Sequence, residues 1–270
     1  MTEGLRIVTG AGYPGEGISR GLARGLLVYY GDCNLTGEGM GIGSAALRNR
    51  RCTYFSRTWT DVDDDGVFRR TFSLDTRMRW TVFGLPSDRL TRFMESAVGV
   101  YMRLPRLQTA LLHLVFPVRA ILGIHPRFET VPSCGRVAFS YRIAPDHVDV
   151  RVVPELQAGE EDTLCLLNEL GAAWFTAAED GRATGTRMPG WEKVESERMP
   201  VSLVDRAHGV RFSLDRPSTG RAPPVAVYWG RERNGDHSWA GFCIELGPLN
   251  GSREFPEVRY RIGIAREAPA

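Results

Sequence analysis

Short apolar runs in which buried-type and polar residues alternate recur along most of the chain. Between residues 26 and 84 they include LLVYY, VFRRTFSL and MRWTVFG, and turn-forming stretches such as DVDDDG at 61–66 separate them. Alternation with a period of two residues predicts strands with one buried face, and the turn chemistry predicts hairpins between them. The clearest hairpin joins RVAFSYRIA to HVDVRVVPE through a proline and an aspartate.

Residues 86–123 follow a different pattern. Ser87 or Asp88 is a good N-cap, and apolar residues then fall at helical spacing: Leu104, Leu107, Leu111, Leu114, Val118 and Leu122. Pro105 and Pro117 should break this segment into pieces. We therefore predict a helical insertion that acts as a mobile cover or as a contact surface, including a possible homodimer contact.

Strand patterns resume after the insertion, at 163–168, 172–178, 201–206, 209–214, 224–230, 239–246 and 257–265. About a dozen strands in meander order predict a mainly β protein. We expect a single β domain over residues 1–270, either a large antiparallel β-sandwich (a supersandwich) or a closed barrel, with the helical insertion at about 86–123.

The composition narrows the classes of partner. The formal charge of +2 over 270 residues gives no electrostatic argument for nucleic acid. The most apolar window, ALLHLVFPVRAILGI at 110–124, is too short for a membrane span. Lys193 is the only lysine, so nearly all cations are arginines, whose forked guanidinium groups suit carboxylate or phosphate ligands.

Cysteine usage and the first residues indicate a compartment. The five cysteines are scattered and form no C-x-x-C pair, which argues against a disulfide framework and against a zinc knuckle. No His-x-His or His-x-x-x-His spacing is present, so we expect no metal site and no cofactor. Because MTEGLRIVTG lacks the pattern of a secretory signal, we expect a cytoplasmic protein.

The N-terminal stretch LRIVTGAGYPGEGISRGLARGLL resembles the opening of a short-chain dehydrogenase. Gly10, Gly12 and Gly15 have G-x-G-x-x-G spacing after an apolar run. The later chain supplies strands in meander order where alternating strand–helix units are required, and a Tyr-x-x-x-Lys pair is impossible because Pro189 stands four residues before the only lysine. We interpret these glycines as loop residues and predict no nicotinamide binding.

A second glycine-rich stretch, NLTGEGMGIGSAALR at 34–48, contains alternating glycines. In an extended strand they would leave one face bare, so that a ligand or another chain segment approaches the backbone closely. One interpretation is a tightly packed sheet corner. The other is a polar pocket in which Glu38, Arg48 and Arg57 bind substrate, with Trp59 as an aromatic surface for a sugar ring.

Glu245 is the strongest candidate for chemistry. It lies within HSWAGFCIELGP, where alternation places Phe242, Ile244 and Leu246 on one face and Cys243 and Glu245 on the other. A carboxylate in an apolar strand resists burial unless it is paired or used, so Glu245 is either a general base that faces a cleft or the partner of an arginine such as Arg259 or Arg261. Of the five histidines, His125 and His237 are the best placed to serve as the acid.

The GFCIE run, with His237 and Ser238 before it and a proline after it, resembles the late strand of the galactose mutarotase-like, or aldose epimerase, family. The resemblance implies a β-supersandwich and an enzyme that moves protons on a carbohydrate or sugar acid, with Glu245 as the base. The family's Asn-His-x-Tyr-Phe run, which holds its catalytic histidine, does not occur here.

Two alternatives stay open. VYWGRERNGDHSWAGFCIEL resembles the closing strands of the carotenoid-hydratase and cyclase relatives, which implies a lipocalin-like barrel for an apolar or isoprenoid ligand. The apolar stripe of the insertion is also compatible with a non-catalytic assembly protein.

Overall fold

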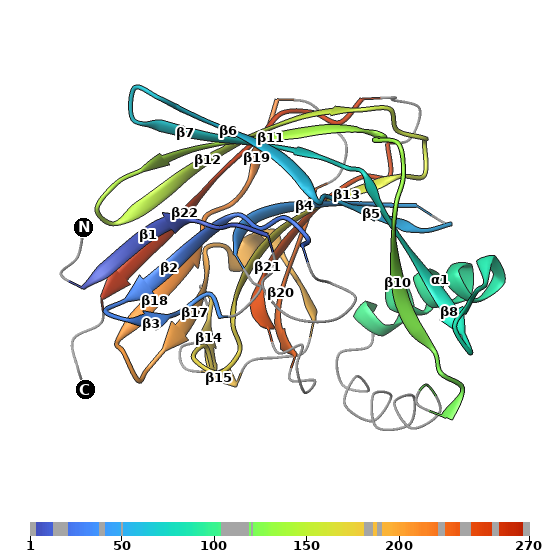
Figure 1. The fold of residues 1–270 in the computed structure, drawn as a ribbon. Helices are drawn as coiled ribbons and strands as arrows, with labels where there is room; N and C mark the ends of the chain where they lie inside the picture. The colour runs from blue at the N-terminus through green and yellow to red at the C-terminus, as the bar shows by residue number, and fades with distance from the viewer. Residues whose placement is uncertain are drawn as a thin grey trace.

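A computed structural model describes residues 4–12, 21–37, 41–49, 51–103, 119, 121–180, 186–187, 191–220, 225–232, 239–249 and 254–266. These residues form two large antiparallel sheets, one α-helix and one short 3₁₀-helix, Ser196–Arg198. Figure 1 shows the helix at the right of the view, while strands of one of the two sheets run from the top of the molecule to its lower left.

The first sheet has twelve strands and follows the path β10-β8-β5-β4-β13-β21-β20-β16, with β1, β2, β3 and β9 attached beside it. Its strands are β1 Leu5–Thr9, β2 Leu26–Tyr30, β3 Cys33–Asn34, β4 Ile42–Arg48, β5 Thr53–Phe55, β8 Thr76–Val82, β9 Leu85–Pro86, β10 His125–Thr130, β13 Thr163–Gly171, β16 Glu192–Val194, β20 Val225–Glu232 and β21 Trp239–Leu246.

The second sheet has ten strands and follows the path β15-β14-β17-β18-β22-β12-β11-β7-β6, with β19 beside β22. Its strands are β6 Thr58–Asp64, β7 Val67–Ser73, β11 Gly135–Ile143, β12 His147–Leu156, β14 Ala177–Glu179, β15 Thr186–Arg187, β17 Val201–Asp205, β18 Val210–Leu214, β19 Ser218–Thr219 and β22 Val258–Arg266.

The main core lies between the two sheets. Each strand contributes alternate residues to it, as period-two patterning requires. The twelve-stranded sheet supplies Leu164, Leu166, Phe242, Ile244 and Leu246, and the ten-stranded sheet supplies Val137, Phe139, Val150, Phe212 and Ile262. The β-sandwich prediction is therefore confirmed, and the closed-barrel alternative is wrong, since in the described residues each sheet is an open path with two edges.

The predicted hairpins and the N-terminal prediction can be checked strand by strand. β11 pairs with β12 antiparallel from Gly135 opposite Leu156 to Ile143 opposite Val148, which confirms the clearest predicted hairpin. The DVDDDG stretch turns at Asp65 and Gly66, both with positive φ, between β6 and β7. β1 pairs with β2 antiparallel, whereas a dinucleotide-binding unit requires parallel strands joined by a helix.

Gly43, in the 34–48 stretch, lies at a tightly packed contact between the sheets. Gly43 has a φ of +80°, and a Cβ built there would lie 2.2 Å from the Tyr141 hydroxyl of the other sheet. The Tyr141 hydroxyl donates a hydrogen bond to the Gly43 carbonyl at 3.1 Å. Another chain segment, and not a ligand, therefore takes the space that Gly43 leaves.

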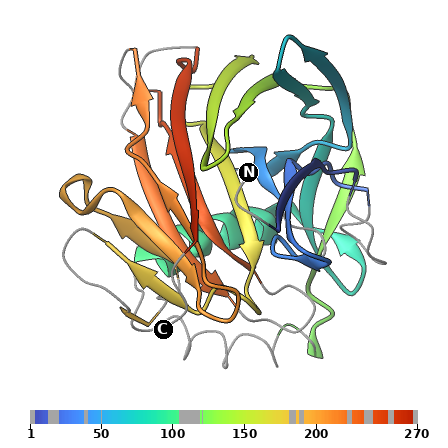
Figure 2. The same cartoon turned by 90° about the vertical axis from the view of Figure 1, so that its left-hand side faces the viewer.

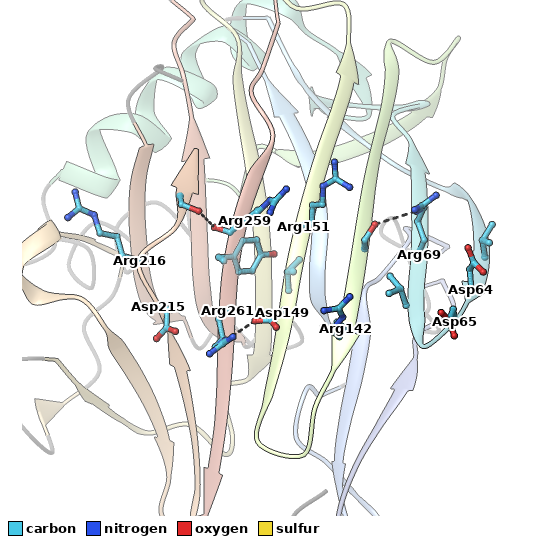
Figure 3. Close-up of a pocket in the computed structure, with 16 residues that line it drawn as sticks. Asp64, Asp65, Arg69, Arg142, Asp149, Arg151, Asp215, Arg216, Arg259 and Arg261 are labelled. Atoms are coloured by element: carbon cyan, nitrogen blue, oxygen red, sulfur yellow. Dashed lines mark hydrogen bonds and ion pairs between the residues drawn. The ribbon is translucent and has the colours of Figure 1, made fainter. Parts of the chain in front are cut away.

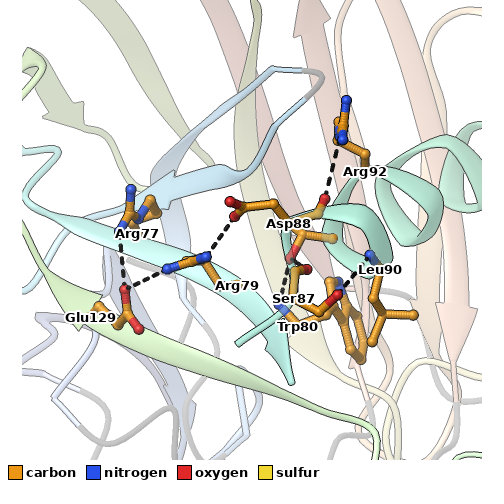
Figure 4. Close-up of polar contacts among 9 residues, drawn as sticks. Arg77, Arg79, Trp80, Ser87, Asp88, Leu90, Arg92 and Glu129 are labelled. Atoms are coloured by element: carbon orange, nitrogen blue, oxygen red, sulfur yellow. Dashed lines mark hydrogen bonds and ion pairs between the residues drawn. The ribbon is translucent and has the colours of Figure 1, made fainter. Parts of the chain in front are cut away.

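Helix α1, Asp88–Arg103, occupies the first part of the predicted insertion. Ser87 caps it by accepting the Leu90 amide through its hydroxyl, and the Thr91 side chain binds the Trp80 amide of β8 (Figure 4). The helix contacts β8 near one end of the twelve-stranded sheet and β16 at the other, so it crosses the sheet on the side away from the core (Figure 2).

Of the predicted apolar stripe, Leu104 to Val118 lie outside the described residues, and Leu122 is exposed. Among the residues that are described, no helix combines the length and the apolar character needed to cross a bilayer. The homodimer contact through the insertion stays a prediction.

Candidate functional site

Glu245, the strongest candidate for chemistry in the sequence, lies on the outer face of the twelve-stranded sheet. This face is turned away from the main core and is crossed by α1. On β21 the residues Phe242, Ile244 and Leu246 face the core, whereas Cys243 packs in a separate cluster with Ala46 and Cys165. Glu245 shares the face of Cys243, as predicted. It is 8% exposed, so the carboxylate is buried.

Glu245 is held by Arg48. The Arg48 Nη2 atom donates to Glu245 Oε1 at 2.9 Å, across β13, which lies between β4 and β21. The predicted pairing with Arg259 or Arg261 is wrong, because β22 belongs to the other sheet and its Arg261 binds Asp149 at 2.7 Å. Arg48 is thus the ion-pair partner of the predicted base.

Two buried cysteines complete the surroundings of Glu245. The Cys165 Sγ lies 3.8 Å from Glu245 Oε1, and the donor atoms of Cys165, Cys243 and Glu245 all lie within 4.8 Å of one another. Three donors match the protein ligand count of many catalytic zinc sites. However, the hydrogen bond with Cys165 and burial raise the pKa of the Cys243 thiol well above its usual range, and Arg48 already occupies the carboxylate. The cluster is better described as a polar interior contact.

Glu169, on β13, differs from Glu245 in having no side-chain partner among the described residues. It alternates with Cys165 and Leu167 on the outer face, and in the described residues its carboxylate has no hydrogen bond or ion pair. Burial raises the pKa of Glu169 to about 7. A carboxyl group with a pKa near neutrality and no structural partner is suited to take up and release a proton.

The neighbours of Glu169 follow from the strand register. Glu169 pairs with Gly241 of β21, which pairs in turn with Gly230 of β20, so no side chain projects beside the carboxyl group on these two strands. Trp239 is the diagonal neighbour on β21, and its ring lies 4.2 Å from that of Trp191, centroid to centroid. Glu169 therefore shares the outer face with an aromatic pair, one diagonal position away.

The two carboxylates of this face do not form a catalytic pair. Cys165 lies opposite Glu245, and Glu169 lies four residues further along β13. At about 3.4 Å per residue the two glutamates are offset by roughly 14 Å along the strands, beyond the separation that glycosidase carboxylate pairs use.

Several predicted site residues lie elsewhere. His125 is exposed on the edge strand β10, five strands from β21, which is roughly 24 Å at the usual strand spacing. Trp59 belongs to the ten-stranded sheet, where it packs against the core below Arg70. Arg57 follows β5, and its amide binds Asp75. These three residues do not converge on Glu245; Glu38 and His237 lie outside the described residues.

The sequence-based prediction missed Glu169 because the strand pattern was ended at residue 168. The signal was the same one that identified Glu245, a carboxylate inside an apolar strand, here CLLNELG.

Two cavities stand out in the described residues, of about 840 and 490 Å³. Charged side chains line both cavities, so neither favours an apolar ligand. Glu245 lines neither of them.

No family model matches the chain, and no curated protein matches it. One solved structure to which it is similar is a 4-alpha-glucanotransferase from Thermococcus litoralis, with a TM-score of 0.30 and 8% identity over 84% of this chain and 27% of that one. A TM-score this low carries no argument about fold or activity. The comparisons therefore leave the function to be argued from the chain's own residues.

Proposed function

We propose that this chain is a carbohydrate-processing enzyme of the epimerase or lyase type, in which Glu169 moves the proton. The observation that carries the proposal is the state of Glu169: half-buried, without an ion-pair or hydrogen-bond partner among the described residues, and with a pKa of about 7. A group with this pKa is present in both forms near neutral pH, so one side chain is able to accept a proton and to return it.

The aromatic pair supports a sugar as the substrate class. Trp239 is a diagonal neighbour of Glu169 on the outer face and Trp191 packs against Trp239, and tryptophan rings pack against the apolar face of a sugar ring while its hydroxyls stay available for hydrogen bonds. In this proposal Glu245 has a structural role, since Arg48 and Cys165 occupy its Oε1 atom.

The test is proton exchange and anomer interconversion of D-galactose and D-galacturonate, followed by NMR in D₂O. Glu169→Gln keeps the shape of the side chain and removes its basicity, so turnover should fall at least about a hundredfold. Glu155→Gln, at an exposed position of β12, is the matched control and should leave turnover unchanged.

The pH profile gives a second readout. In the parent protein, turnover should fall as the pH drops through about 7, because Glu169 becomes protonated. Parental turnover in Glu169→Gln, or no exchange with either sugar, would contradict the proposal.

A further inference from the structure

The larger cavity, of about 840 Å³, lies on the outer face of the ten-stranded sheet and has no part in the proposed chemistry. Figure 3 shows charged side chains projecting from the strands that form its floor. Six arginines and four aspartates line it: Arg69, Arg142, Arg151, Arg216, Arg259, Arg261, Asp64, Asp65, Asp149 and Asp215.

The strand register arranges the central arginines in two rows. Arg69 of β7 pairs with Ser140 of β11, Ser140 with Arg151 of β12, and Arg151 with Arg259 of β22. The row beside it runs from Arg142 through Asp149 to Arg261. Neighbouring strands lie about 4.8 Å apart, so cations recur across the floor at one or two strand spacings.

The ion pairs leave a positive surplus in the middle of the floor. Arg261 is neutralised by Asp149, whereas Arg151 and Arg259 share the single carboxylate of Glu257. Arg69 donates only to the Ser140 hydroxyl, at 3.3 Å, and Arg142 has no ion-pair or hydrogen-bond partner in the part of the chain that the structure describes. Both side chains belong to exposed residues and are available to a ligand.

The remaining aspartates stand towards the sides of the cavity. Asp64 and Asp65 lie at the turn between β6 and β7, and Asp215 follows β18 beyond β22. An anion that lies across the central strands therefore meets arginines, and one that extends past them meets carboxylates. This distribution favours a chain of spaced charges over a duplex with dense charge on its whole surface.

We propose that this face binds an acidic polysaccharide through the carboxylates of its sugar units, with Arg69 and Arg142 as the principal contacts. The requirement for an anion rests on this face alone, and the choice of a sugar rests on the proposed function. Planar guanidinium forks bind carboxylates with two parallel hydrogen bonds. Single-stranded nucleic acid is disfavoured because the one aromatic residue of the lining, Tyr260, is buried and its hydroxyl binds Asn168, so no ring is offered to bases.

The experiment is calorimetric titration of the full chain with polygalacturonate, with dextran as the neutral comparison. The parent should bind polygalacturonate, more weakly as salt is raised, and should not bind dextran. Replacing Arg69 and Arg142 together by glutamine should weaken binding at least about tenfold. Arg136→Gln is the matched control, since Arg136 is exposed on the same face of β11 but outside the cavity.

Three results would overturn the proposal: no binding of polygalacturonate, undiminished binding by the Arg69→Gln/Arg142→Gln protein, or tighter binding of single-stranded poly(dT) than of polygalacturonate. The Glu169→Gln protein separates the two proposals. It should bind polygalacturonate as the parent does, so a failure of the acid–base proposal leaves this result unchanged.

Discussion

At the scale of single residues, Glu245 and Glu169 show how neighbours decide what a carboxylate in an apolar strand does. Glu245 has an arginine within 2.9 Å, whereas the half-buried Glu169 is desolvated and has no side-chain partner in the part of the chain that the structure describes. Both lie in apolar strands of similar composition, so sequence pattern alone does not distinguish them. The difference arises from β4, which brings Arg48 next to a residue 197 positions away along the chain.

Replacing Glu245 by glutamine should lower the free energy of unfolding by about 1–3 kcal/mol, because it leaves the partly buried Arg48 guanidinium without its counter-charge. The range extends down to about 1 kcal/mol because the Arg48 side chain is 25% exposed, and water weakens an ion pair that it reaches. Urea unfolding measures the change. The double variant Arg48→Met/Glu245→Met should lose less than the two single replacements together; an additive cycle would show that the pair contributes nothing.

Replacing Glu169 by glutamine should raise the free energy of unfolding, and only at higher pH. The folded-state pKa of about 7 lies above the ordinary value of 4.5, so the folded protein holds this proton more tightly than the unfolded chain does, and stability falls as pH rises between these values. Glutamine avoids this cost. The variant should be more stable than the parent by about 2–3 kcal/mol at about pH 8 and nearly equal to it at about pH 4.5. Equal stability of the two proteins in urea at both pH values would contradict the raised pKa.

At the scale of elements, α1 is attached differently from the strands beneath it. Its N-terminus is fixed by Ser87 and by the Thr91–Trp80 hydrogen bond, and the helix lies outside the sandwich. β11, in contrast, is paired on both sides and buries Val137, Phe139 and Tyr141.

Hydrogen exchange should therefore be faster in α1 than in residues 137–143 of β11, because opening the helix does not expose the main core. Mass spectrometry of peptides after timed exchange measures both segments in one sample. Equal protection of the two segments would mean that α1 opens only when the whole protein unfolds, which would argue against a cover.

Elements with regular local signals were predictable from the sequence, and their long-range neighbours were not. The β11–β12 hairpin follows from alternation around a short turn, and the α1 start follows from Ser87. In contrast, β21 pairs with β13 on one side, and β22 lies between β12 and β18, and nothing in the local pattern specifies these choices. The wrong partner for Glu245 and the wrong place for His125 both follow from this, since each depends on which strands become neighbours.

At the scale of the whole molecule, the contact of Tyr141 with Gly43 joins the two sheets through the core. Gly43→Ala should destabilise the protein by more than about 2 kcal/mol, because the new methyl group would meet the Tyr141 ring at a backbone φ of +80°. Tyr141→Phe should cost about 1–2 kcal/mol through the unpaired carbonyl. The double variant, compared by thermal unfolding, should cost less than the sum; a simple sum would show that the two positions are independent.

The free edge of the ten-stranded sheet has a consequence for how copies of this protein behave together. Within the described residues β6 pairs only with β7, so one side of its backbone is unpaired, and an unpaired edge is a template onto which another chain can add a strand. Asp63 and Asp64 on this strand, with Asp65 after it, place negative charge on every molecule at the position where two edges would meet. We expect mutual repulsion at this seam to oppose polymerisation in concentrated solutions, and because salt screens exposed charges, concentrated salt should be the storage condition under which this protection is weakest.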